Sequence, residues 1–144
     1  RPLGDLRVCD LFKHLHHHYK ERVLYSDPQA IPEWGDFLNS KIMKTSIRSL
    51  SGGENQMVKL AVLLNLKADI WFLDEPFGHL DPEKRKRLLG ILGKSSKMMV
   101  MIDHHWDLLK GLCHRFVMME PGEGIVKVEK MIKANELETE ESWS

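Results

Sequence analysis

The chain has 144 residues, of which 42% are hydrophobic and 29% are charged, and this balance excludes wholesale disorder. Basic and acidic residues number 21 each, so the formal net charge is zero and no basic field indicates a nucleic-acid partner. Cys9 and Cys113 lie far apart without the spacing of a metal or redox motif, and the apolar runs are too short to span a bilayer.

The first half of the chain is expected to be mainly helical. Apolar residues recur at helical spacing and predict an amphipathic helix over residues 5–19. Two prolines then punctuate the chain before a short helix expected over residues 33–39. A further helix is predicted over residues 51–66, where Ser51 and two glycines precede an apolar stretch.

Short apolar strands alternate with helices in the second half of the chain. Asp81 is a favourable N-cap and Pro82 a favourable first-turn residue for a helix over residues 83–92. The alternation indicates a parallel α/β layer, in which strand methionines such as Met98 and Met101 are expected to pack in the core. The strands are expected over residues 69–73, 97–102, 115–119 and 125–128, and a second helix over residues 105–112.

Three polar segments of this layer suit chemistry at a phosphate group. The first, Leu50-Ser51-Gly52-Gly53-Glu54, opens a helix, where small side chains let backbone N–H groups approach an anion closely. On its own, such a Ser-Gly-Gly start is more often a plain turn. The order and spacing of the three segments therefore matter more than this one.

The second and third segments follow the first two predicted strands. Asp74 and Glu75 come at the end of a strand, where α/β proteins bind ligands, and the alternative is a solvated acidic strand end. Asp74 suits Mg²⁺, and Glu75 suits the orientation and polarisation of an attacking water. His104 follows the next strand and can reach a γ-phosphate, although a lone histidine there is usually a surface residue.

Taken in order, these segments resemble the motifs of ATP-binding cassette (ABC) ATPases. The resemblance covers residues 1–128 and implies an α/β fold that is part of a three-layer P-loop NTPase, with parallel strands and a helical subdomain. The helical subdomain would occupy residues 1–66 and end in the signature helix. The C-terminal half of the nucleotide-binding core would occupy residues 67–130, and an acidic tail would occupy residues 131–144. The matching segments are Leu50–Glu54 (signature), Asp74-Glu75-Pro76 (Walker B), Leu80-Asp81 (D-loop) and His104 (switch histidine).

The resemblance implies a role for each matched residue in binding ATP and Mg²⁺. Two cassettes pair head to tail, so that each ATP lies between the P-loop of one chain and the signature of the other. Asp74 would then hold Mg²⁺, Glu75 would be the general base, and His104 would sense the γ-phosphate. Ser51, Gly52, Gly53 and Glu54 would contact ATP on the partner cassette, and Asp81 would couple the two sites.

The sequence departs from the family pattern in several places, and two of these departures bear most on the proposed chemistry. No GxxxxGK[ST] motif occurs, and because the P-loop supplies most of the grip on phosphate, the chain alone is expected to be inactive. Asp103 stands where Thr or Ser usually precedes the histidine. By analogy with the family's sheet, the strand over residues 98–102 would also lack a neighbour and present an apolar, unpaired edge.

The function implied is that of the ATP-hydrolysing subunit of an ABC transporter, at the cytoplasmic face of the membrane. Its partners would be a second cassette and separate transmembrane subunits, with no direct nucleic-acid contact. Trp34 and Phe37 would either dock on a membrane partner or pack in the core. The alternatives are a soluble ABC ATPase of the DNA-repair or translation-factor class, and a non-catalytic truncated cassette that pairs with a complete one.

Overall fold

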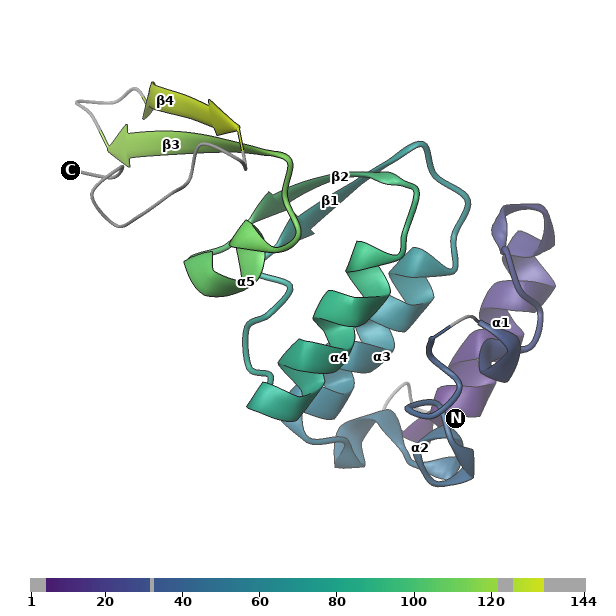
Figure 1. The fold of residues 1–144 in the computed structure, drawn as a ribbon. Helices are drawn as coiled ribbons and strands as arrows, with labels where there is room; N and C mark the ends of the chain where they lie inside the picture. The colour runs from purple at the N-terminus through teal and green to yellow at the C-terminus, as the bar shows by residue number, and fades with distance from the viewer. Residues whose placement is uncertain (1–4, 32, 122–125, 134–144) are drawn as a thin grey trace. The chain divides into compact units, whose positions relative to one another are not determined.

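The computed structural model describes residues 5–31, 33–121 and 126–133 and divides into two compact units, residues 1–103 and 104–144 (Figure 1). Within the described residues, no helix combines the length and apolar character needed to cross a membrane. The first unit contains α1 (Val8–Tyr19), α2 (Ser40–Lys44), α3 (Gly52–Leu64), β1 (Ile70–Asp74), α4 (Pro82–Gly93) and β2 (Met98–Ile102). The second contains α5 (Trp106–Lys110), β3 (Arg115–Pro121) and β4 (Val126–Lys133).

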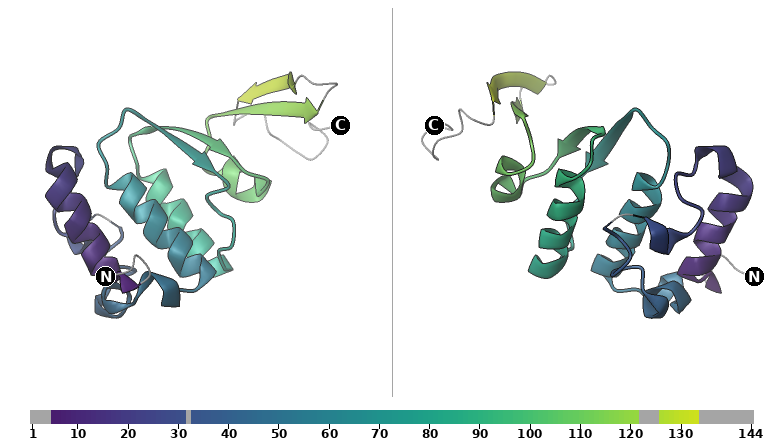
Figure 2. Two further views of the ribbon diagram at one scale, coloured as in Figure 1. Left: turned by 180° about the vertical axis from the view of Figure 1, so that it is seen from behind. Right: turned by 45° about the vertical axis from the view of Figure 1, so that its right-hand side comes forward.

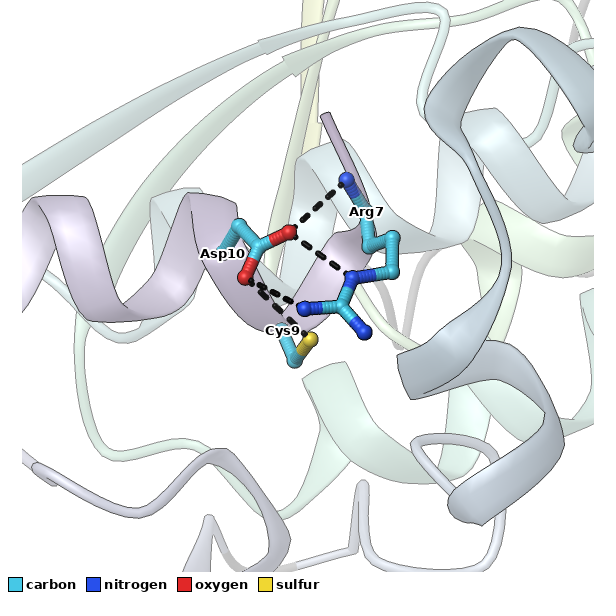
Figure 3. Close-up of polar contacts among 3 residues, drawn as sticks. All are labelled: Arg7, Cys9 and Asp10. Carbon is cyan, nitrogen blue, oxygen red and sulfur yellow. Dashed lines mark hydrogen bonds and ion pairs between the residues drawn. The ribbon is translucent and has the colours of Figure 1, made fainter. Parts of the chain in front are cut away.

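Helix α1 begins later than its apolar pattern predicts, because the preceding backbone pairs with a distant segment. The Leu6 carbonyl accepts from the Ile47 N–H at 2.9 Å, and the Val8 N–H donates to the Thr45 carbonyl at 3.1 Å. In the first turn, the Asp10 carboxylate accepts hydrogen bonds from the Arg7 guanidinium at 2.9 and 3.1 Å (Figure 3). A carboxylate in this place also complements the positive end of the helix.

The prediction of a short helix over residues 33–39 is wrong. Residues 33–38 form turns, and the helix in this region is α2, over Ser40–Lys44. Glu33 adopts a left-handed backbone with φ 70°, which a helix cannot accommodate. The Asn39 side chain accepts from the N–H groups of Lys41 and Ile42, so the helical segment starts after it. Trp34 and Phe37 are buried with ring centroids 6.1 Å apart, which favours core packing over docking.

Strands β1 and β2 pair in parallel from Ile70 opposite Met98 to Asp74 opposite Ile102, as the alternation of strands and helices predicts. Helices α3 and α4 lie side by side along one face of this sheet (Figures 1 and 2). On that face the sequence places Trp71 and Leu73, both buried.

The opposite face of the β1–β2 sheet is apolar and exposed. Phe72 is 74% exposed and Ile102 67%, and Met98 is 63% exposed rather than in the core as expected. The period of two along each strand accounts for the difference, because it sends alternate side chains away from the helices. The members of this exposed sheet face are Ile70, Phe72, Met98, Val100 and Ile102.

The second unit is built on an antiparallel pair rather than on further parallel strands. Strand β3 pairs with β4 from Arg115 opposite Lys133 to Pro121 opposite Val126, with a register shift at Met118/Met119. Leu109 of α5 and Phe116 of β3 are buried. Of the expected acidic tail, residues 131–133 belong to β4 and residues 134–144 lie outside the described residues.

Candidate functional site

The glycine-rich segment forms the N-terminus of α3, as predicted. Ser51 is the N-cap, and its hydroxyl oxygen accepts from the Glu54 N–H at 3.2 Å. The Glu54 carboxylate accepts in return from the Ser51 N–H at 2.8 Å, which completes a capping box. The first turn of a 13-residue helix therefore starts at an exposed serine and a glycine.

Gly53 lies against the loop that joins β1 to α4. A Cβ atom at this position would come 3.1 Å from the His79 carbonyl oxygen and 3.4 Å from Cδ of Lys84. A Cβ on Gly52 would instead meet no atom within 4 Å. One turn further along α3, the Gln56 side chain donates to the Pro76 carbonyl at 3.4 Å. The start of α3 and the β1–α4 loop thus form one packed region of the first unit.

Asp74 and Glu75 lie at the carboxyl end of β1, and both are exposed. The Glu75 N–H donates to the carbonyl of Ile102 at 2.7 Å, so the pairing of the two strands continues one residue beyond β1. Glu75 has a left-handed backbone with φ 45°, and its carbonyl accepts from the Gly78 N–H at 2.9 Å. An accessible carboxylate oxygen at this edge has the chemistry that Mg²⁺ requires, and Asp74 supplies one.

The rest of the β1–α4 loop is anchored in the core. Pro76, Phe77 and Leu80 are buried, whereas His79, with φ 60°, is exposed. The Phe77 N–H donates to Oδ2 of Asp103 at 3.2 Å. Sequence reasoning did not foresee this contact, although an acid directly after β2 was visible as a departure from the family pattern.

Asp81 is the N-cap of α4, as expected. Its carboxylate accepts from the Lys84 N–H at 2.9 Å and forms an ion pair with the Lys84 ammonium group. Hydrogen bonds from the Lys84 side chain and backbone lower the pKa of Asp81 below its ordinary value. Asp81 therefore stays ionised to a lower pH than an ordinary aspartate, and its charge stabilises the start of α4.

His104 begins the second unit, directly after Asp103 closes the first. Its ring centroid lies 4.2 Å from that of His105, and His104 is the more exposed of the two. The structure brings Asp74, Glu75 and Asp103 to one edge of the β1–β2 sheet within the first unit. The role of His104 stays a prediction.

A parallel β–α–β unit whose first strand ends in adjacent acids, preceded by a helix with a glycine-rich start, is typical of α/β domains that bind ligands at the carboxyl edge of the sheet. Residues 13–78 match the profile of the ABC transporter family. A putative ABC transporter ATP-binding protein of Nitratidesulfovibrio vulgaris is 41% identical over 73 residues, covering 51% of this chain and 27% of the relative. The trimethylamine N-oxide transport system ATP-binding protein TmoW of Ruegeria pomeroyi is 43% identical over 82 residues, which cover 52% of this chain and 23% of the relative.

Solved structures agree on the fold. A dimeric ATP-binding cassette bound to ADP and phosphate is similar with a TM-score of 0.67 at 20% identity, covering 91% of this chain and 58% of that one. A putative metal-chelate type ABC transporter gives a TM-score of 0.63 at 17% identity, covering 96% and 57%. The chain is therefore similar to the ABC transporter family over residues 13–78, and its fold is that of part of an ATP-binding cassette. It spans about a quarter of the length of the two curated relatives above.

Proposed function

We propose that this chain is part of the ATP-hydrolysing subunit of an ABC transporter, which drives solute movement through separate membrane subunits at the cytoplasmic face. The observation that carries the proposal is the pair Asp74 and Glu75, exposed at the carboxyl end of β1 in a family-matched segment. Ligands of open α/β sheets bind at this edge. The two adjacent carboxylates suit two different tasks in hydrolysis.

Glu75 is assigned the role of general base. Its exposed carboxylate can accept a hydrogen bond from a water and draw a proton from it as the water attacks phosphorus. Asp74 would hold Mg²⁺, which when bound neutralises charge on phosphate oxygens. His104 would sense the γ-phosphate, because a protonated or neutral imidazole can donate to a phosphate oxygen.

The N-terminus of α3 is assigned to ATP that is bound on a partner cassette. Its first-turn N–H groups and positive helix end favour an anion, and Gly52 leaves open space where a phosphate oxygen can approach. The Ser51 hydroxyl accepts within the capping box and still has a proton to donate. Ser51, Gly52, Gly53 and Glu54 would form this surface, and Asp81 would couple it to the site of its own chain.

The chain by itself is proposed to neither bind ATP tightly nor hydrolyse it. No GxxxxGK[ST] segment occurs in its sequence, so the phosphates lack the lysine and backbone cradle that this motif supplies. A nucleotide titration of the isolated chain is expected to show no binding in the micromolar range. Saturable micromolar binding would contradict this part of the proposal.

Hydrolysis by the complete assembly that contains this chain tests the assignment of Glu75. Glu75→Gln keeps the shape of the side chain but removes its basicity, so kcat should fall on the order of a hundredfold or more. The matched control is Glu83→Gln, which changes another exposed glutamate, in the first turn of α4, and should leave kcat unchanged. Equal activity of the two variants would refute the role of Glu75. Co-purification with membrane subunits, rather than with another cassette alone, would support a transporter over a non-catalytic module.

A further inference from the structure

We propose that Asp103 is a positioning residue for Glu75, acting through the backbone of residues 75–78. This inference rests on the proposed function, in which Glu75 is the general base. Asp103 lies directly after β2, and Glu75 directly after β1, so the two follow neighbouring parallel strands. The contact between these two segments joins residues that are 26 positions apart in the sequence.

Two hydrogen bonds tie the segment after β1 to the end of β2. The Glu75 N–H donates to the Ile102 carbonyl at 2.7 Å, and the Phe77 N–H donates to Oδ2 of Asp103 at 3.2 Å. Between them stands Pro76, which has no N–H group. The Phe77 amide is therefore the first after Glu75 that can anchor the chain through a donated hydrogen bond.

The left-handed backbone of Glu75 needs hydrogen bonds that hold the chain both at residue 75 and just after it. Its φ of 45° is left-handed, a region that residues with a Cβ atom seldom adopt and that persists where the surroundings enforce it. The hydrogen bond from the Gly78 N–H to the Glu75 carbonyl, at 2.9 Å, closes the turn but does not attach the turn to the sheet. The Glu75 N–H provides one attachment to the end of β2, and the hydrogen bond from the Phe77 N–H to Asp103 provides the second.

The surroundings of the Phe77 amide make the carboxylate of Asp103 well suited to this task. The Phe77 side chain is fully buried, so its amide needs a partner within the protein. Asp103 is half-buried and offers a carboxylate oxygen, which binds an N–H more strongly than a neutral acceptor does. Removing that oxygen frees the turn to leave the left-handed conformation, and the Glu75 carboxylate then moves away from its working position.

Three variants test the inference in the complete assembly. Asp103→Ala removes the acceptor, Asp103→Asn keeps one acceptor oxygen without the charge, and Asp69→Ala is the matched control, an exposed aspartate before β1. Asp103→Ala should speed hydrogen exchange of the Phe77 amide about tenfold, as expected for loss of one such bond. It should also lower kcat on the order of tenfold to a hundredfold at unchanged KM, because a base displaced by about 1 Å loses efficiency without affecting ATP binding.

The outcomes separate this inference from the proposed function. Recovery of kcat and of Phe77 protection by Asp103→Asn, with Asp69→Ala at wild-type levels, would support the positioning role. Unchanged Phe77 exchange in Asp103→Ala would overturn it, and so would faster exchange with an unchanged kcat in an assembly that hydrolyses ATP. A wild-type assembly that shows no hydrolysis would overturn the proposed function and, with it, the positioning role.

Discussion

Gly53 sits where the start of α3 meets the carbonyl group of His79. A Cβ atom there would come within 3.1 Å of that oxygen, whereas Gly52 has open space around it. We expect Gly53→Ala to lower the free energy of unfolding by about 1 kcal/mol through overpacking. Gly52→Ala should be neutral or stabilising by up to about 1 kcal/mol, because alanine is the better helix former.

Urea unfolding of the two alanine variants provides the measurement for this comparison. The pair is matched, since the positions are adjacent and the substitution is the same. A Gly53→Ala chain as stable as the Gly52→Ala chain would mean that the β1–α4 loop moves freely away from α3. The packed region described around Gly53 and His79 would then not exist in solution.

Asp10 gives the start of α1 a predictable response to acid. The hydrogen bond from the Arg7 guanidinium lowers the pKa of Asp10 from its ordinary value of 3.8 to about 2 (Figure 3). Because this pKa is lower in the folded chain, charged Asp10 stabilises the fold above pH 3.8, and the contribution is lost as the pH falls through about 2. Asp10→Asn should therefore lose less stability over this pH window than the wild type.

An NMR titration of the Asp10 carboxyl group checks the cause directly. Arg7→Gln removes the guanidinium and should return the pKa of Asp10 toward its ordinary value. If the pKa of Asp10 were equally low in Arg7→Gln, the ion pair would not be what depresses it. The exposure of the pair keeps its effect on stability small.

Single residues of the candidate site differ in how far the sequence predicts them. Asp74, Glu75 and Asp81 could be placed at a strand end and a helix start because their local signals are strong, and the structure puts them there. Their chemical roles stay predictions. Asp103 could not be connected to Phe77, because a hydrogen bond across 26 positions leaves no periodic trace in one sequence.

At the level of elements, the start of α4 depends on Asp81. Its carboxylate accepts the Lys84 N–H at 2.9 Å, one of the first-turn donors that a helix leaves unpaired. Asp81→Ala should lower the midpoint temperature of unfolding, while Asp81→Ser retains a capping oxygen and should lower it much less. Thermal unfolding of the wild type, Asp81→Ala and Asp81→Ser measures the effect. An equal loss of stability in both variants would rule out a capping role.

The helices with local end signals were predictable, and those set by distant contacts were not. Helices α3 and α4 begin at the expected serine and aspartate, since N-caps and a following proline act within a few residues. The start of α1 is shifted because residues 6–8 bond to residues 45–47. The turns over residues 33–38 follow from a left-handed Glu33, which carries no distinctive sequence mark.

For the whole molecule, we expect the exposed sheet face to promote self-association. Phe72 is 74% exposed on this face, while Leu73 is buried on the other. Phe72→Ser should leave the free energy of unfolding within about 0.5 kcal/mol and reduce self-association, because it removes exposed apolar area. Leu73→Ser should destabilise the fold by about 3 kcal/mol or more, since it creates a cavity and buries a hydroxyl group.

Light scattering at several protein concentrations, with denaturant unfolding alongside, measures both effects. A Phe72→Ser chain that associates as strongly as the wild type would show that another surface drives association. A stable Leu73→Ser chain would show that the two faces of the sheet have been exchanged. Such an exchange is what a one-residue slip in strand register produces.

The overall architecture was predictable to the level of class but not of detail. The parallel pairing of β1 and β2 follows from the helix between them, which is a local pattern. The exposure of Met98 was missed, because an apolar run in the sequence does not reveal which face of a strand is covered. The antiparallel pairing of β3 and β4 was likewise missed, because an apolar run does not reveal the direction of the neighbouring strand.

At position 75, conformational stability and the proposed catalytic role favour different residues. Its left-handed backbone with φ 45° suits glycine best, yet the proposed reaction requires a carboxylate at that place. Glycine at this position would relieve the backbone but would remove the carboxylate that the proposed reaction needs. Glutamate at a left-handed position therefore costs conformational stability that only its proposed chemical role would offset.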